Sequence, residues 1–367
     1  MAKKFEVLAL PNEAIEPLVK AWDPDVVIDA TMRSPSFKEQ IEIFKLDCDS
    51  MDFIAKPDKV ELTARFKMTE VKMSCVQMSD EYFAKSKVRK VNGTYVKSSI
   101  SERHVNGIGQ ATVYMEFNCD DQSMKCQQAA LEQVLKHLLS IVKVKTFNFT
   151  CKQLSPMFVD LFFWKYSKIF GTIKVERADL RPTIVSPESL VFLLEELRAE
   201  KRDLRIKVDG FKYEKPIQGK HLYINSLNWI TSVCFMSPEA VKIKTHSHPC
   251  SELDINELLK NWVNGGCPNL ETLSLDISRT NATEEGLYRG LPLKPTIFTA
   301  AELNRRLSDI PMKPVDIKRD TDGRLATLTF MEGMRVEMSV WHRKHLLFLD
   351  PAIYGKLKQH HYGPYFS

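Results

Sequence analysis

The sequence predicts an α+β fold in which short helices come first, alternating strands follow, and strand–helix units fill most of the remainder. Apolar residues recur at helical spacing near the N-terminus, at alternate positions between Lys59 and Phe117, and in strand-then-helix units after Val142. Hydrophobic residues make up 44% of the 367 residues and charged residues 27%, which is the balance of a chain that folds around a core.

The first segment, residues 1–48, has the pattern of two or three short helices, because Asp23-Pro24 and Ser34-Pro35 interrupt its helical spacing. The apolar face of the first helix carries Ala14, Ile15, Leu18, Val19 and Trp22. Helices this short bury little surface alone. We therefore expect them to pack on the following domain or on a partner.

Residues 49–121 form a β-rich connecting region in which apolar and polar residues alternate. The clearest runs are Val60–Phe66 and Ala111–Phe117. Between them, Asn92-Gly93 is typical of a tight hairpin turn.

Residues 122–300 are predicted to form a βα-repeat domain that opens with an amphipathic helix at 122–142. Strands are expected at 145–151, 172–178, 204–209, 240–244 and 270–277, and helices at 156–168, 187–198 and 253–263. Many of the strands lie about 30 residues apart, and such units bury their apolar faces only by stacking. The pattern thus predicts an irregular, leucine-rich-repeat-like solenoid.

Residues 301–367 are predicted to hold a C-terminal helix and antiparallel hairpins. Alternating residues at 325–331 and 334–341 follow the stretch Val315 to Gly323, in which Asp322-Gly323 favours a turn. Antiparallel strands here would cap the open end of the solenoid.

The charge balance and the cysteines narrow the function and the compartment. The 52 Lys and Arg residues exceed the 47 Asp and Glu residues only slightly and are spread along the chain, so nucleic acid is not an expected partner. No apolar run is long enough to span a membrane, and no secretory signal is recognised. We expect a cytoplasmic or nuclear protein with eight reduced cysteines.

Chemistry-bearing residues do not form a recognisable catalytic or metal-binding pattern. His246-Ser-His248-Pro-Cys250 lacks a fourth zinc ligand at suitable spacing, and Ser251 with Asp254 is typical of a helix capping box. His342 and His345 have no nucleophile in a strand–turn–helix elbow. We predict no catalytic residue, metal or cofactor. An enzyme of unrecognised class stays the alternative and requires a pocket where such groups converge.

Three blocks of the sequence resemble one family. Leu8-x-Leu10-Pro11 with the following apolar helix resembles the opening of an F-box. Leu227-Asn-Trp229-Ile230, the run Leu253 to Trp262 with Asn256, Leu258 and Leu259, and Asn269-Leu270-Glu271-x-Leu273 resemble the F-box-associated type 2 (FBA_2) domain expanded in nematodes. Ile317-Lys-Arg319-x-x-Asp322-Gly323-x-x-Ala326-Thr327 with Val340-Trp341 is similar to the C-terminal hairpin of that family.

The resemblance implies a substrate-recognition adaptor of a Skp–cullin–F-box E3 ubiquitin ligase, without catalytic activity of its own. Its partners would be a Skp-type adaptor, the cullin scaffold and an unknown target protein. The implied adaptor-binding residues are Leu8, Leu10, Pro11, Ile15, Leu18 and Val27. The chain departs from the family at Asp29, whose carboxylate would weaken docking unless it is paired. The alternative is a protein-interaction domain that has lost its ligase coupling.

Overall fold

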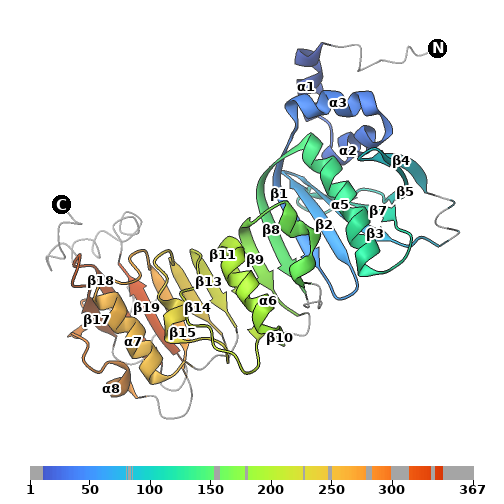
Figure 1. The fold of residues 1–367 in the computed structure, drawn as a ribbon. Helices are drawn as coiled ribbons and strands as arrows, with labels where there is room; N and C mark the ends of the chain where they lie inside the picture. The colour runs from blue at the N-terminus through green and yellow to red at the C-terminus, as the bar shows by residue number, and fades with distance from the viewer. Residues whose placement is uncertain are drawn as a thin grey trace, which may run out of the picture. The chain divides into compact units, whose positions relative to one another are not determined.

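In this computed structural model, the described residues are 11–79, 81, 84, 86–152, 158–177, 181–225, 228–246, 250–277, 283–298, 314–331 and 335–341. The chain divides into two compact units, residues 1–172 and 173–367 (Figure 1). Both units combine helices with strands, which confirms the predicted mixed class. Within the described ranges, no helix has the length and apolar character that crossing a bilayer requires.

The first unit opens with three short helices, as predicted: α1 (Asn12–Lys20), α2 (Pro24–Arg33) and α3 (Pro35–Phe44). Pro24 and Pro35 each occupy the first turn of a helix, where the missing N–H costs no hydrogen bond. Ser34 caps α3, because its side-chain oxygen accepts from the Phe37 backbone N–H at 3.3 Å. The local sequence alone therefore accounts for two of the three helix starts.

A mixed sheet follows the helices. Its main strands are β1 (Leu46–Ala55), β2 (Val60–Phe66), β3 (Thr69–Val76), β7 (Ala111–Asn118) and β8 (Val142–Cys151). β1 pairs in parallel with β8 and antiparallel with β2, β2 pairs antiparallel with β3, and β3 pairs in parallel with β7. The β-rich region and the strand predicted at 145–151 thus belong to one sheet.

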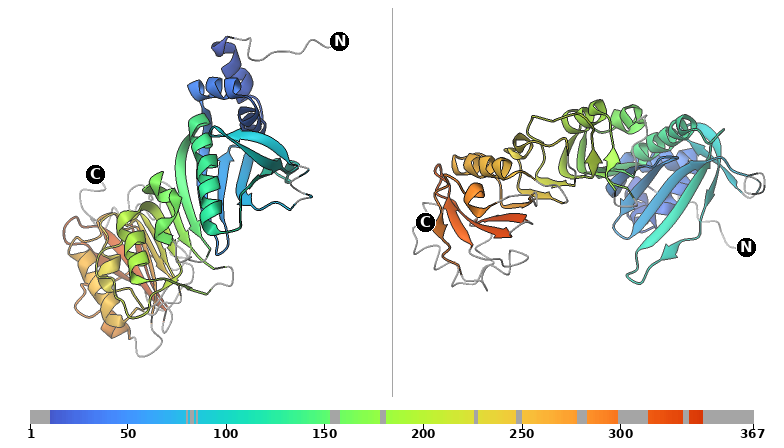
Figure 2. Two further views of the ribbon diagram at one scale, coloured as in Figure 1. Left: turned by 45° about the vertical axis from the view of Figure 1, so that its right-hand side comes forward. Right: turned by 90° about the horizontal axis from the view of Figure 1, so that it is seen from below.

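Helix α5 (Met124–Ile141) covers one face of this sheet (Figure 2). Strand register places the buried side chains of Phe53, Leu62, Met73 and Met115 side by side in one row across β1, β2, β3 and β7. The helix contributes three buried leucines, one valine and one isoleucine to the same layer. Period-two alternation in the strands and period-3.6 spacing in the helix meet in a single core.

The predicted hairpin joins β4 (Lys87–Val91) to β5 (Thr94–Ile100). Asn92 and Gly93 form its two-residue turn with φ values of 45° and 88°. A turn with two positive φ values needs residues that tolerate the left-handed region, which is why Asn-Gly is favoured there. β5 pairs antiparallel with β7, as does the short β6 (His104–Val105).

The helix predicted at 156–168 is wrong. The described part of this segment contains two short 3₁₀ turns, η2 (Phe158–Asp160) and η3 (Phe162–Lys165). Phe162, Phe163 and Trp164 are all buried, and three consecutive positions cannot share one face of an α-helix. These aromatic residues belong to the core, where Phe163 and Trp164 pack against Phe149 of β8.

The second unit is built around parallel strands. The parallel strands are β11 (Arg198–Leu204), β13 (His221–Ile224), β14 (Lys242–Thr245) and β15 (Thr272–Asp276), which pair in this order. β9 (Ile169–Val175) pairs with β11 on its other side. Register partners Lys201, His221, Lys242 and Thr272 follow one another by 20, 21 and 30 residues. Strand–helix repetition is therefore present, whereas the comparison with a leucine-rich-repeat solenoid stays a prediction.

Helical segments connect these strands on one side (Figure 2). They are α6 (Pro187–Val191) with the π-helical turn η4 (Phe192–Glu196), η5 (Ser232–Phe235), α7 (Glu252–Val263) and α8 (Glu284–Leu287). The predicted capping box of α7 is confirmed, since Ser251 Oγ accepts from Asp254 N–H and Asp254 accepts from Ser251 N–H.

The prediction at 187–209 needs correction. The helix ends at Glu196, and the principal strand is β11 at 198–204 rather than a strand at 204–209. Only β12 (Ile206–Lys207) lies in the predicted range, and it pairs with β10 (Thr183–Ile184) in a separate two-stranded sheet. The short β13 was not predicted either. In the sequence, the run Arg198 to Asp203 is rich in charged residues, which is typical of a surface segment. In the structure, Arg202 occupies an inward position of this run and is buried.

The three C-terminal strands are confirmed as β17 (Val315–Lys318), β18 (Leu325–Met331) and β19 (Arg335–Val340), paired antiparallel. β17 also pairs with β16 (Lys294–Pro295). β19 pairs antiparallel with β15, so these strands cover the free edge of the parallel strands. The predicted C-terminal helix lies outside the described residues.

Arg202 holds β11 against the helical layer. Its guanidinium is fully buried and donates to the backbone carbonyls of Leu193, Leu197 and Gln218 at 2.6–2.8 Å, with a longer bond of 3.5 Å to Leu194. Burial lowers the pKa of Arg202 to about 10, which leaves the group charged at neutral pH. Carbonyl oxygens at the end of a helical segment suit a cation, because the peptide dipoles point their negative ends at it.

We expect Arg202→Met to lower the free energy of unfolding by about 3 kcal/mol or more, because four buried carbonyl oxygens lose their donor. The matched control is Arg198→Met on the same strand, where the side chain is exposed. Urea unfolding followed by circular dichroism measures both. Equal effects of the two substitutions would contradict an anchoring role for Arg202.

Candidate interaction surfaces

The structure separates the predicted adaptor-binding residues into inward and outward groups. Leu8 and Leu10 lie outside the described residues. Ile15 and Val27 are fully buried beneath the helices, whereas Pro11 is exposed and Leu18 is half-buried. Ile15 and Val27 therefore support the helical surface from below and do not form it.

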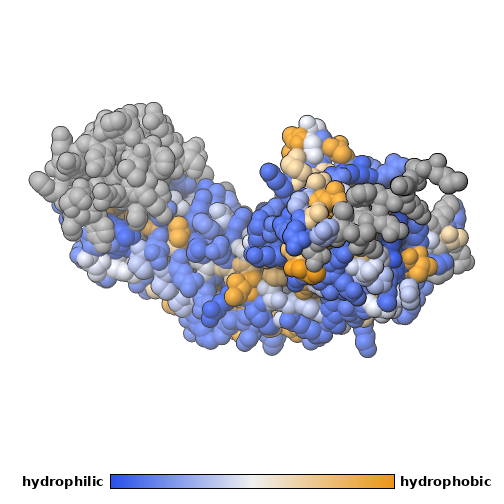
Figure 3. Space-filling model, turned by 90° about the horizontal axis from the view of Figure 1, so that it is seen from above, coloured by the Kyte–Doolittle hydropathy of each residue, from blue (hydrophilic) through white to orange (hydrophobic). Residues whose placement is uncertain are grey.

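An apolar stripe runs along the outer side of α1. Its members are Pro11, Ala14, Pro17 and the partly exposed Leu18, at positions that share one face of a helix. Ile43 near the end of α3 is 68% exposed. Figure 3 shows apolar side chains interspersed with polar ones on this side of the first unit. This surface is the part of the helical segment that a partner can reach.

Asp29 is paired within the chain. It accepts from Arg89 Nε of β4 at 2.6 Å and forms an ion pair with Arg33 one turn later in α2. Arg89 is 3% exposed and also donates to the backbone and side-chain oxygens of Ser98 at 2.7 and 2.9 Å. The carboxylate that departs from the F-box pattern therefore attaches α2 to the β4–β5 hairpin.

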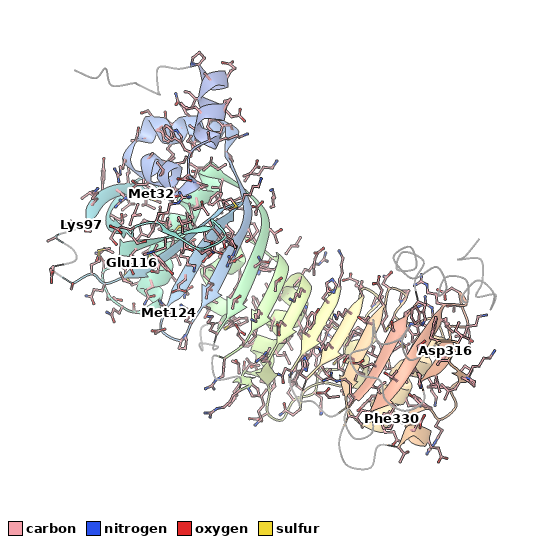
Figure 4. The ribbon with its side chains drawn as sticks, turned by 180° about the vertical axis from the view of Figure 1, so that it is seen from behind. Met32, Lys97, Glu116, Met124, Asp316 and Phe330 are labelled. Carbon is pink, nitrogen blue, oxygen red and sulfur yellow. The ribbon has the colours of Figure 1, made fainter. Side chains whose placement is uncertain are left out.

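A second acidic residue of α2 reinforces this docking. Asp25 accepts from Arg103 Nη1 at 3.0 Å, and Arg103 also donates to Thr69 on β3 at 3.2 Å. Burial raises the pKa of Asp25 against the opposing effect of Arg103. Figure 4 shows Met32 of α2 and Lys97 of β5 on the same side of the unit. The inner face of α2 is thus occupied by the hairpin and not free for a partner.

His137 joins three elements at the base of the helices. The side chain is fully buried on α5; its Nδ1 accepts from the Asn92 backbone N–H at 3.4 Å, and its Nε2 lies 3.0 Å from Thr31 Oγ1 of α2. Thr31 Oγ1 in turn donates to the Ile28 carbonyl at 2.7 Å. This chain of bonds requires the neutral imidazole with its proton on Nε2. Burial, helped by Lys38, lowers the pKa of His137 to about 4.

Several residues of the second block of family resemblance, between Leu227 and Leu273, lie in the core of the second unit. Trp229 and Trp262 are fully buried, and Trp229 Nε1 donates to the Ile206 carbonyl at 3.1 Å. Asn256 Nδ2 donates to the carbonyls of Leu287 and Arg289 at 2.8 and 3.0 Å, which fastens α7 to the segment around α8. These side chains stabilise the fold and, being buried, are not available to a partner.

The C-terminal resembling block is also structural. Arg319 is 1% exposed. Its guanidinium donates to both carboxylate oxygens of Asp322 and lies 5.2 Å from the centre of the Trp262 ring. Trp341 Nε1 donates to Thr327 Oγ1 at 2.9 Å, and Thr327 donates to Asp316 at 2.6 Å. Hydrogen bonds of Thr327 therefore join the last strands to one another, and the Arg319 guanidinium over the Trp262 ring joins the turn after β17 to α7.

One protein-family model matches part of the second unit. The family model described as F-box associated matches residues 216–275, which span β13, β14, α7 and most of β15. This segment is therefore similar to the F-box associated type 2 family. No curated protein and no solved structure matches the chain.

The F-box associated segment and its surroundings show no catalytic arrangement among the described residues. A pocket of about 500 Å³ is lined by Tyr213, Ser237 and other residues, none of them histidine. Ser237 Oγ is buried without a hydrogen-bond partner in the described structure, so no base activates it. His246 is exposed, while Cys250 is buried and burial raises the pKa of its thiol to about 12. His248, His342 and His345 lie outside the described residues.

Cysteines and metal ligands give a similar picture. Seven of the eight cysteines are buried, and none of the eight forms a disulfide. Among the described residues, no three His, Cys, Asp or Glu side chains lie close enough to hold a metal ion. The burial of Arg89, Arg202 and Arg319 was not predicted, because an isolated charged residue in a sequence is typical of the surface.

We expect the first unit to lose stability as the pH falls from about 6.5 to about 4. His137 binds a proton over this range in the unfolded chain but not in the folded one, and the penalty approaches about 3 kcal/mol near pH 4. Above pH 6.5 the residue has no effect on the pH dependence. Urea unfolding of wild type and His137→Gln across this range measures the difference. Parallel pH curves for the two proteins would contradict the assignment of a buried neutral imidazole.

Proposed function

We propose that this protein is a substrate-recognition adaptor of a Skp–cullin–F-box E3 ubiquitin ligase. The N-terminal helices would bind the Skp-type adaptor, which links to the cullin scaffold, and the second unit would capture a target protein. The observation that supports this most is the F-box associated segment in a chain that begins with short helices carrying an exposed apolar stripe. Such stripes dock into hydrophobic grooves of partner proteins.

In the proposed mechanism, this chain positions the target protein and catalyses no reaction itself. A receptor that holds the target beside a ubiquitin-loaded partner raises the effective concentration of target lysines. The role places the protein in the cytoplasm or nucleus. Neither bond cleavage nor a cofactor is required of the chain, which we propose to be non-catalytic.

A specific observation favours a second candidate, a protein-interaction domain that has lost ligase coupling. Ile15 and Val27 are buried, and the carboxylate of Asp29 is hydrogen-bonded to Arg89. An adaptor that needed these side chains would have to release α2 from the hairpin. The two candidates therefore differ in whether the outer face of α1 alone sustains adaptor binding.

We expect the chain to bind a purified Skp-type adaptor in a pull-down, and the double variant Ala14→Asp, Leu18→Asp to lose most of that binding. Both side chains lie on the outer side of α1, so carboxylates there would be desolvated by a docked partner without disturbing the core. The control is Ile108→Asp, because Ile108 is 79% exposed near β7, away from the helices.

Circular dichroism establishes that wild type and both variants are folded. Equal binding by the two variants would contradict docking through α1. A folded wild type that does not bind the adaptor would favour the interaction domain without ligase coupling.

A further inference from the structure

Within the described ranges, the parallel strands of the second unit have one face on which no helix packs. Along β13, β14 and residues 201–204 of β11, alternate side chains are buried and the ones between them are half-buried, so the second set points away from the helical layer. Register places Lys201, His221 and Lys242 in one row across the three strands, and Asp203, Tyr223 and Lys244 in the next. Figure 4 views these strands from the side opposite to Figure 1.

Tyr223 lies between two lysines at the middle of this face. Lys201 Nζ is 5.1 Å and Lys242 Nζ is 5.8 Å from the centre of its ring. Cations over an aromatic ring are held by its quadrupole while they keep their charge. The ring therefore holds two ammonium groups from neighbouring strands close together.

Positive charge on this face is not neutralised by the described residues. Four cations of this face have no ion-pair partner in the described parts of the chain: Lys201, Lys242, Lys244 and Arg205, which directly follows β11. Asp203 is the one carboxylate in the two rows. The pKa of His246 beside them is lowered by partial burial and then by Lys244, while Asp276 opposes the shift. These four cations outnumber the one carboxylate in the two rows.

Neighbouring strands on the same sheet show the opposite pattern. Lys174 of β9 pairs with Glu176 at 2.8 Å, and Arg335 of β19 pairs with Asp276 of β15 at 2.9 Å. The cations of β11 and β14 are thus bounded on both sides by paired charges. A surface with an excess of positive charge suits a ligand of the opposite sign.

We propose that this basic face, defined by Lys201, Arg205, Tyr223, Lys242 and Lys244, binds an extended acidic peptide segment of the target protein. The inference rests on the proposed substrate-recognition role and names the chemistry of the substrate. Carboxylates at alternate positions of an extended peptide recur about 6.8 Å apart, the same spacing as Lys242 and Lys244 along β14. Nucleic acid fits less well, because two ammonium groups already occupy the ring on which a base would stack.

The test is fluorescence anisotropy of a fluorescein-labelled peptide of alternating Glu and Thr residues, titrated with the full chain at low salt. We expect Lys242→Gln, Lys244→Gln to weaken binding at least about tenfold, and Gln in place of Glu in the peptide to do the same. The matched control is Lys207→Gln, Lys220→Gln, which removes the same charge from lysines paired with Asp209 and Glu200 outside the face. This control is expected to bind the peptide as wild type does.

Several outcomes would overturn the inference. They are the absence of peptide binding by wild type, an equal loss in both double variants, and tighter binding of a labelled single-stranded RNA of equal charge that also depends on Lys242 and Lys244. The adaptor pull-down with the same variants separates the two proposals. Adaptor binding without peptide binding would overturn the basic face alone, and peptide binding without adaptor binding would overturn the ligase role alone.

Discussion

Buried guanidinium groups hold this protein together at the places where its short elements have too little apolar surface to do so. Arg89, Arg202 and Arg319 are at most 3% exposed. The first joins α2 to the β4–β5 hairpin, the second ties β11 to the preceding helical segment, and the third fastens the turn after β17 to α7. A buried cation is expensive unless oxygen acceptors surround it, and carbonyl or carboxylate oxygens meet each of the three.

This use of charge in the interior decides which surfaces remain for partners. Asp29 directs the inner face of α2 to the hairpin, which leaves the outer side of α1 as the accessible apolar stripe. In the second unit, Arg202 points inward while Lys201 and Asp203 on either side of it point outward. One strand therefore supplies both an internal anchor and the edge of a basic face. The residues that carry the family resemblance lie mostly inside, so they specify the fold more than the ligand.

Much of the fold could be predicted because its signals are local. The Asn92-Gly93 turn, the proline-led helices and the Ser251 capping box each depend on a few neighbouring residues. β11 could not be found, because an arginine at an inward position looks like a surface residue until its carbonyl acceptors are in place. The consecutive aromatic residues at 162–164 suggested a helix, and only the sheet beneath them shows why 3₁₀ turns bury all three.

The candidate site was predictable only in part for a related reason. Helical spacing placed Ile15 and Leu18 on one apolar face, yet it could not say whether that face meets the rest of the chain or a partner. The structure divides it, with Ile15 inside and Leu18 at the rim. Likewise, the basic face depends on strand register between segments 20 and 21 residues apart, which no local pattern reveals.

We expect partners to bind the outward side chains while the buried anchors stay in place. Hydrogen–deuterium exchange of the chain with and without a Skp-type adaptor tests this expectation most directly. We predict slower exchange in α1 (Asn12–Lys20) on binding, with unchanged exchange in α2 and in the hairpin that holds Arg89. Faster exchange of α2 and the hairpin on binding, which would mean that Val27 and Asp29 are released toward the adaptor, would contradict it.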